Sequence, residues 1–262
     1  MSGSDERRNV SAQGAPCWVN LMVADLAVAR AFYGEVLGWK FRSSSLDDQF
    51  LVATAGGHPV AGIGARRPGL APASVWTPYF AVRDADVTAA RIRERGATVA
   101  VGPMAMGDGR VGLAADRDGA TFGFWQGYTL AWSPGEGQAP ARIDLQTRDV
   151  FDAAVFYGEV FGWAEGEDVD VAYRKDHVLV HLGGRVILSL RGGGVQTSPL
   201  AHLRPRWLVN FAVDDVERAV AAATSAGGVR PEPSAATWAP SGFSRTLQDP
   251  DGGLFTLSQR AV

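Results

Sequence analysis

Apolar and polar residues alternate along four short stretches of the chain, and each stretch leads into an aspartate and then into apolar positions spaced three and four apart. The first copy runs through 18–23 to Asp25 and stops at Gly38. Alternation with a period of two predicts a strand, the aspartate a helix N-cap, and the glycine the end of the helix. The helical apolar positions are Leu26, Ala29, Phe32, Tyr33, Val36 and Leu37.

The eight residues FYGEVLGW at 32–39 return as FYGEVFGW at 156–163, in the same place within the pattern. Two weaker copies of strand, cap and helix follow at 77–96 and 207–228. Each of these leads to a turn and an alternating strand, the turns being DRDG from position 116 and DPDG from position 249. The pattern predicts four units of strand, helix and further strands, in which a pair of units is repeated as a pair.

The stretch AWSPGEGQAPA at 131–141 separates the two pairs and contains the glycine, proline and serine typical of linkers. We predict a disordered tail at 1–13, a first domain at 14–130, a linker at 131–137 and a second domain at 138–262. Apolar residues make up 46% of the chain, which supplies ample material for a core.

Charge and apolar runs exclude several classes of function. The net charge is −3 and the basic residues are interrupted by acids, so we expect no nucleic-acid partner. No apolar run reaches the length of a membrane span, and the polar start of the chain lacks a leader pattern, so we expect a cytoplasmic protein with no membrane partner. The single cysteine, Cys17, excludes an intramolecular disulfide and a cysteine-based zinc cluster, and we expect it to be buried.

The tandem units, with FY and GW around the end of the first helix and DPDG before the last strand, resemble the vicinal oxygen chelate superfamily. This superfamily includes glyoxalase I, fosfomycin and bleomycin resistance proteins and extradiol dioxygenases, and the four-unit chain is similar to its two-domain actinobacterial members of the mycobacterial 27-kDa antigen type. The resemblance implies an α+β fold of four βαβββ modules in two glyoxalase-like domains. Each domain is then a curved mixed sheet that encloses a cavity, with helices outside.

Strand alternation assigns the faces of the sheets independently of that resemblance. One set of positions is uniformly apolar and is expected under the helices; it comprises Val19, Leu21, Val23, Phe80, Val82, Ile143, Leu145, Val209, Phe211 and Val213. The opposite set is mixed in character and is expected to face the cavities; it comprises Trp18, Asn20, Met22, Thr77, Tyr79, Ala81, Arg142, Asp144, Gln146, Leu208, Asn210 and Ala212.

Metal-binding members of the superfamily place His, Gln or Glu near the start of each first strand and Glu in the last strand. The matching positions here are Trp18, Thr77, Gly123, Arg142, Leu208 and Thr256. None of these is a usual ligand of a divalent metal, because they offer indole, alkyl and guanidinium groups or a lone hydroxyl. We therefore predict no metal site and no cofactor, and no glyoxalase I, extradiol dioxygenase or metal-dependent thiol-transferase activity.

The two predicted cavities differ in chemistry. The ligand-binding candidates of the first are aromatic or uncharged: Trp18, Asn20, Met22, Thr77, Tyr79 and Trp125. The candidates of the second are polar: Gln146, Asn210 and Thr256 for binding, with Asp144, Arg142, His177 and His181 as catalytic residues if the protein is an enzyme.

Each candidate also has a purely structural interpretation. Trp18 and Trp125 can fill a core, and Arg142 and Asp144 can form a structural ion pair. His177 and His181 are four positions apart, so on one strand they would lie about 13 Å apart, too far to share a metal. Either can instead serve as a surface or hydrogen-bonded residue.

Two functional hypotheses follow. In the first, a monomer or homodimer binds an aromatic or polycyclic small molecule, such as a natural product, and sequesters it without a metal, as in antibiotic resistance. In the second, a metal-free enzyme of specialised metabolism, an isomerase, cyclase, lyase or hydroxylase-type protein, acts in the polar cavity. There Asp144 or a histidine would be the base and Arg142 would stabilise an oxyanion.

Overall fold

The computed structural model describes residues 11–44, 49–66, 74–130, 132–163, 169–231 and 244–260. It contains the four predicted helices, α1 (Leu26–Leu37), α2 (Ala85–Glu94), α3 (Val150–Phe161) and α4 (Val216–Ser225). An aspartate caps each N-terminus by accepting backbone N–H bonds; the four are Asp25, Asp84, Asp149 and Asp215. Helices α1 and α3 end at Gly38 and Gly162, whose φ angles of 67° and 68° suit glycine. None of the described helices combines the length and apolarity needed to cross a membrane.

The first half of the chain forms an eight-stranded sheet in the order β2-β3-β4-β1-β5-β8-β7-β6. Its strands are β1 (Pro16–Val23), β2 (Lys40–Ser43), β3 (Phe50–Ala55), β4 (His58–Ala65), β5 (Trp76–Ala81), β6 (Thr98–Met106), β7 (Gly109–Ala115) and β8 (Thr121–Gln126). The first strand of each unit pairs in parallel with the last strand of the same unit, and the two first strands pair antiparallel at the centre.

The second half forms a seven-stranded sheet in the order β10-β11-β12-β9-β13-β15-β14. Its strands are β9 (Arg142–Gln146), β10 (Val169–Tyr173), β11 (His177–Leu182), β12 (Arg185–Arg191), β13 (Arg206–Val213), β14 (Ser244–Gln248) and β15 (Leu254–Gln259), with a short 3-10 helix at Ala201–Leu203. At the place in the second half that corresponds to β6, the described residues form an isolated bridge between Val229 and Gln248. Residues 232–243 lie outside the described residues. The α+β class and the tandem arrangement of mixed sheets are confirmed.

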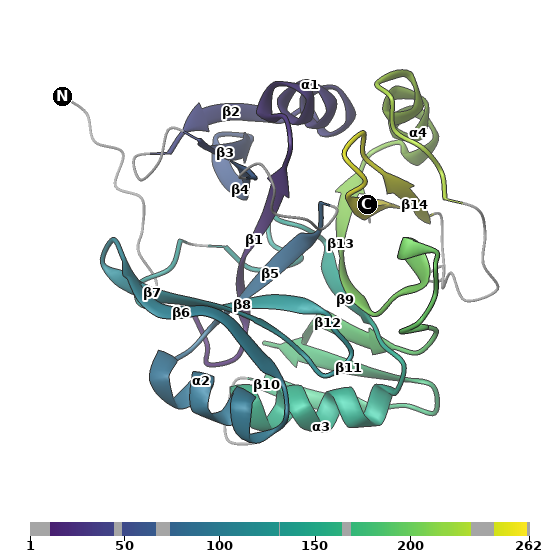
Figure 1. The fold of residues 1–262 in the computed structure, drawn as a ribbon. Coiled ribbons are helices and arrows are strands. Elements are labelled where there is room, and N and C mark those ends of the chain that lie inside the picture. The colour runs from purple at the N-terminus through teal and green to yellow at the C-terminus, as the bar shows by residue number, and fades with distance from the viewer. Residues whose placement is uncertain are drawn as a thin grey trace.

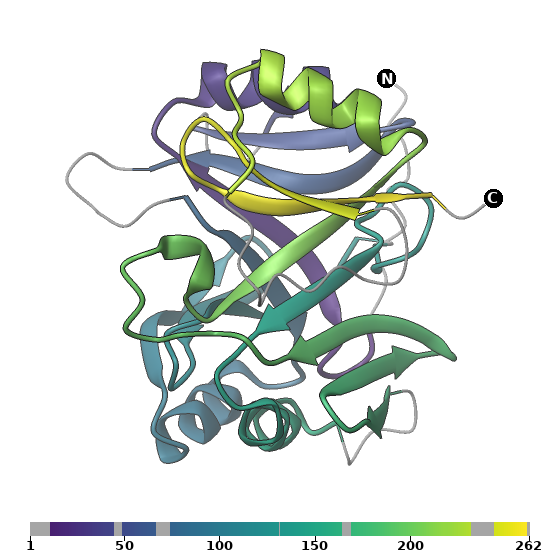
Figure 2. The same cartoon turned by 90° about the vertical axis from the view of Figure 1, so that its right-hand side faces the viewer.

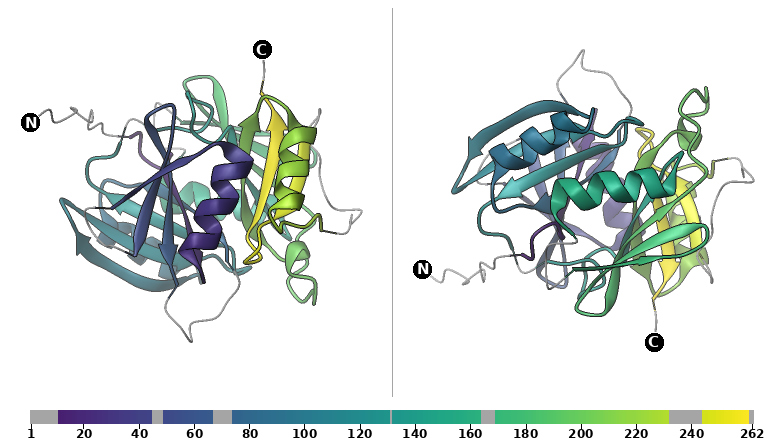
Figure 3. Two further views of the ribbon diagram at one scale, coloured as in Figure 1. Left: turned by 90° about the horizontal axis from the view of Figure 1, so that it is seen from above. Right: turned by 90° about the horizontal axis from the view of Figure 1, so that it is seen from below.

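The helices of the two halves pack in crosswise pairs. Helix α1 lies beside α4 at one end of the molecule, and α2 lies beside α3 at the other (Figures 1 and 2). The views from above and below show each pair lying against the sheets (Figure 3). Each pair joins a helix of the first half to a helix of the second, so the helix-covered faces of the two sheets turn toward each other.

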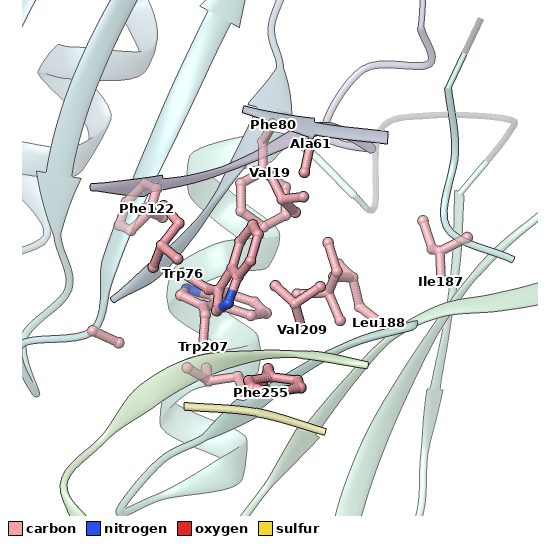
Figure 4. Close-up of a cluster of buried hydrophobic side chains, with 14 of the residues drawn as sticks. Val19, Ala61, Trp76, Phe80, Phe122, Ile187, Leu188, Trp207, Val209 and Phe255 are labelled. Atoms are coloured by element: carbon pink, nitrogen blue, oxygen red, sulfur yellow. The ribbon is translucent and has the colours of Figure 1, made fainter. Parts of the chain in front are cut away.

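The hydrophobic core fills the space between these two faces. Figure 4 shows Trp76 and Trp207 at its centre, with Val19 and Phe80 from one sheet and Val209 from the other. The apolar positions assigned by alternation do face this core. Seven of them are fully buried (Val19, Leu21, Val23, Phe80, Ile143, Leu145 and Val209), Val82 and Phe211 are nearly so, and Val213 is partly buried.

The repeated octapeptide lies at the seam between the halves. The Tyr33 hydroxyl donates to Asp249 Oδ2 at 2.8 Å and accepts from Trp76 Nε1 at 3.2 Å. Tyr157 repeats the arrangement toward the other half, donating to Asp116 at 2.9 Å and accepting from Trp207 at 3.2 Å. The tyrosine of each octapeptide therefore binds the aspartate-glycine turn of the opposite half, a link that helix periodicity alone did not predict.

The predicted disordered tail lies mostly outside the described residues, which begin at 11. Gln13 is held in place, because its amide donates to Phe161 O at 3.0 Å and accepts from Arg83 N at 2.7 Å.

Candidate functional site

Each sheet has a second face, opposite the core, which we call its open face. On the first open face, Trp18 of β1 lies opposite Tyr79 of β5, and Asn20 lies opposite Thr77. The Trp18 indole donates to Asn20 Oδ1 at 2.7 Å. The structure thus brings four of the predicted ligand-binding residues together across the central strand pair.

Tyr79 lies over Gly123 of the neighbouring strand β8. A Cβ atom added at Gly123 would stand 2.2 Å from the Tyr79 ring, so the ring position requires a glycine. Trp125 lies two residues further along β8, with its indole donating to Tyr128 O at 3.0 Å. Met22, at the far end of β1, is 43% exposed. Trp18, Tyr79 and Trp125 are each partly exposed residues, so the first open face carries three aromatic residues within reach of solvent.

Two further aromatic residues on this face were not among the predicted candidates. Phe50 of β3 lies over Gly62 and Gly64, where added Cβ atoms would touch its ring. Trp132, from the segment that joins the halves, is 5% exposed and packs 6.0 Å from Trp18 between ring centroids, with its indole donating to Val60 O. One side of Trp18 therefore packs against a buried residue, which agrees with the interpretation that Trp18 fills a core.

The second open face carries a charged network on β9 and β12. Arg142 donates to both oxygens of Asp144, at 2.6 and 3.1 Å, so the two residues form an ion pair. The Ser189 hydroxyl donates to Asp144 Oδ1 at 2.7 Å and accepts from Arg191 Nε at 2.8 Å. Ser189 and Arg191 were not among the predicted candidates. They are two positions apart in RVILSLR, an otherwise apolar strand, so the alternation places both on the same face.

The other polar candidates of this face have partners within the protein. Asn210 is 2% exposed and accepts from Ser258 Oγ at 2.7 Å, and Thr256 lies 3.3 Å from the hydroxyl of Thr246. The Gln146 amide donates to Gly193 O and His202 O. These contacts engage Asn210 within the protein and tie Gln146 to the loop that follows β12.

The two histidines do not meet. His177 lies opposite Arg191, and its Nδ1 is 2.7 Å from Asp176. His181 lies just past a register shift between β11 and β12, opposite Asp170, whose carboxylate is 3.8 Å from the imidazole Nδ1.

Burial shifts the pKa of several groups without changing their charge at neutral pH. It raises the pKa of the Cys17 thiol to about 12, so this buried cysteine is an unreactive thiol at neutral pH. Burial lowers the pKa of Arg191 to about 10; Asp144 opposes the shift and Arg142 adds to it. Burial, with the nearby charge of Arg204, lowers the pKa of Arg206 to about 10 as well.

The positions that match metal ligands in the superfamily do not fit a divalent ion. Trp18 and Thr77 lie diagonally across the first strand pair, and Arg142 and Leu208 lie in the same way across the second, so all four belong to the open faces. The Arg142 guanidinium is already paired with a carboxylate, and the others offer no usual ligand atom. Among the described residues, no three His, Cys, Asp or Glu side chains are grouped so as to hold a metal.

A groove of about 440 Å³ lies at the seam between the end of α1 and α4. Its charged lining residues include Asp214, Asp215, Arg218 and Arg260. Arg260 pairs with Asp214 at 2.9 Å and Asp215 caps α4, so these three groups have partners within the fold.

Family models match each half of the chain. Residues 17–124 match the Glyoxalase/Bleomycin resistance protein/Dioxygenase superfamily, and residues 142–258 match the glyoxalase-like domain. The anthracycline biosynthesis protein DnrV of Streptomyces peucetius is 31% identical, over 94% of this chain and 93% of its own length. CFP32 of Mycobacterium tuberculosis is 29% identical, over 97% of this chain and 98% of its own length.

Solved structures share the fold at low identity. A Mn(II)-bound glyoxalase from Novosphingobium aromaticivorans aligns with a TM-score of 0.59 at 18% identity, covering 95% of this chain and 83% of its own. Homoprotocatechuate 2,3-dioxygenase from Brevibacterium fuscum aligns with a TM-score of 0.60 at 18% identity, covering 97% of this chain and 83% of its own. At this identity the likeness shows the fold alone.

Proposed function

The chain belongs to the glyoxalase/bleomycin resistance protein/dioxygenase superfamily, and we propose that it is a member that binds an aromatic or polycyclic small molecule without a metal and releases it unchanged. The observation that carries this proposal is the aromatic first open face, with no metal ligand at the matching positions. Its similarity to DnrV, a protein named for anthracycline biosynthesis, favours a polycyclic aromatic ligand. Sequestration is the role that such binding would serve.

Stacking on this face can supply useful affinity. Trp18, Tyr79 and Trp125 lie on β1, β5 and β8, so a flat ligand of several fused rings can contact more than one of them. Each aromatic contact contributes about 0.5–1.5 kcal/mol beyond the burial of apolar area, and about 1.4 kcal/mol is a tenfold change in affinity. Two or three contacts therefore suffice to select aromatic ligands over aliphatic ones.

The test is a fluorescence titration with N-phenyl-1-naphthylamine, a neutral aromatic probe. We expect saturable binding of the probe in the presence of EDTA, and the same affinity after Mn²⁺ is added in excess of the chelator. The Trp18→Ala variant should bind about tenfold more weakly. Tyr173→Ala, which removes a 52% exposed ring from the other sheet, is the control and should bind normally. Absence of saturable binding, or binding only with Mn²⁺, would refute the proposal.

A second candidate is a metal-free enzyme on the second open face, of the isomerase, cyclase, lyase or hydroxylase type. The observation that favours it is the Arg142, Asp144 and Ser189 network, in which Asp144 can accept a proton and Arg142 can stabilise an oxyanion. Against it, Arg142 and Ser189 already donate three hydrogen bonds to the Asp144 carboxylate, which leaves one of its roughly four lone-pair sites for a substrate proton.

Variants separate the two candidates. Under the enzyme hypothesis, Asp144→Ala abolishes turnover of a polycyclic aromatic compound while leaving probe binding to the first open face intact. Under the binding hypothesis, the compound is recovered unchanged from both the unaltered protein and the variant.

A further inference from the structure

Two arginines flank Gln146 on the second open face. Arg206 of β13 pairs with Gln146 of β9 in the antiparallel register, and Gln146 pairs with Arg191 of β12 in the parallel register. All three side chains share the parity opposite the core, because Trp207, Leu145 and Leu190 beside them are buried. Two strand spacings put the arginine Cα atoms about 10 Å apart, and both side chains are long enough to converge above Gln146.

The carboxylates of Asp144 and Asp176 both attract the charge of Arg191, and both are already engaged, Asp176 by His177 Nδ1 at 2.7 Å. Asp144 accepts two bonds from Arg142 and one from Ser189. Arg206, which is partly buried, has no carboxylate partner in the part of the chain that the structure describes; its Nε donates to the backbone oxygen of Arg204 at 3.1 Å. This end of the open face therefore carries more positive than negative charge.

The site between the arginines is held in a fixed geometry. Arg191 Nε donates to the hydroxyl of Ser189, a residue that is fully buried. The Gln146 amide is held by two backbone oxygens, those of Gly193 and His202. Groups held in this way lose little conformational entropy when a ligand binds.

We propose that Arg191 and Arg206 form an anion subsite, which binds a carboxylate or sulfonate group carried by an aromatic ligand on the second open face. Guanidinium groups suit planar oxyanions because they donate in a fixed fork geometry. This inference rests on the proposed function, because its ligand is again a small aromatic molecule. It extends that function to aromatic anions and to a second binding site, on the second open face.

Solvation supports the same assignment. Burial lowers the pKa of both arginines to about 10, which shows that each guanidinium has lost part of its hydration. An oxyanion between the two groups would compensate for that loss.

A matched pair of dyes tests the subsite. 8-Anilinonaphthalene-1-sulfonate and N-phenyl-1-naphthylamine share one aromatic skeleton and differ by the sulfonate. We expect the sulfonated dye to occupy a site that the neutral dye does not compete for, with an affinity that falls as ionic strength rises. Arg191→Gln and Arg206→Gln should each weaken the sulfonated dye about tenfold or more and leave the neutral dye unchanged.

Two further variants keep the test decisive. Arg206→Lys keeps the charge but loses the fork, so it should restore part of the affinity if the subsite binds an anion. Arg110→Gln removes an arginine that pairs with Asp86 on the first half, and it should not affect either dye. Thermal melting of each variant checks that the fold is intact, because Arg206 also contacts the loop at Arg204.

The outcomes separate this inference from the proposed function. If the neutral dye binds and the sulfonated dye gains nothing from the two arginines, the anion subsite is wrong and the proposed function stands. If only the sulfonated dye binds, with dependence on both arginines, the subsite stands and the aromatic site of the first open face is wrong. If neither dye binds, both are wrong.

Discussion

Replacing Tyr33 with phenylalanine removes one hydroxyl group from the seam between the two halves of the chain and leaves the aromatic ring in place. The hydroxyl donates to Asp249 at 2.8 Å and accepts from the Trp76 indole at 3.2 Å. Tyr33 and Trp76 are fully buried, so water does not replace either bond. The change therefore leaves a buried indole N–H without its partner and removes one donor from a buried carboxyl group.

The cost follows from these two losses. A hydrogen bond to a charged group contributes about 1.5–3 kcal/mol, and a buried unsatisfied donor costs about 1–3 kcal/mol. The losses are not fully additive, since Asp249 keeps its bonds from the backbone N–H groups of Asp251 and Gly253. We expect Tyr33→Phe to lower the free energy of unfolding by about 2–4 kcal/mol.

The assay is urea unfolding followed by fluorescence and by circular dichroism. Tyr157→Phe serves as an internal repeat, because Tyr157 makes the corresponding bonds to Asp116 and Trp207, and it should cost a similar amount. Tyr128→Phe alters a tyrosine that is 60% exposed and should change stability by less than about 0.5 kcal/mol. Both probes should report one transition, since a single core joins the halves. A loss below about 0.5 kcal/mol in both seam variants would refute the reasoning.

Three other measurements test separate parts of the structure. Burial raises the pKa of Asp249 above 3.8, so the folded state favours its protonated form and its contribution to stability should fall as the pH rises above 3.8. Urea unfolding of the unaltered protein and of Asp249→Asn across this pH range should show the fall. A stability difference between the two that grows with pH would contradict the assignment. Gly123→Ala places a Cβ atom against the Tyr79 ring, so it should lower the free energy of unfolding by about 1–3 kcal/mol and weaken binding of the neutral dye. Gly34→Ala, where the added atom has its nearest neighbour at 3.6 Å, should do neither. The Cys17 thiol, with a pKa of about 12, should react with a disulfide reagent only after unfolding, and rapid reaction of the native protein would show that it is accessible.

Much of the fold could be predicted from local patterns. The four capping aspartates, the glycines after α1 and α3 and the alternation of apolar positions act within one strand or helix, and all of these were correctly read from the sequence. The parity of β1 placed Trp18, Asn20 and Met22 on the open face for the same reason.

The contacts between the halves could not be predicted in this way. The tyrosines of the octapeptide were assigned to a buried helix edge, but their hydroxyl groups bind turns that lie far away in sequence, and helix periodicity carries no information on such partners. Trp132 was missed because it comes from a segment with no periodic pattern. The pairing of Arg206 with Gln146 and Arg191 depends on strand register across three strands, which only the structure gives.

Native mass spectrometry of the chelator-treated protein with a tetracyclic anthraquinone tests the central claim most directly. The account predicts a complex whose added mass equals that of the intact compound, with no metal, and recovery of the compound unchanged. A complex that forms only when Mn²⁺ is supplied, or a compound that returns chemically altered, would contradict it.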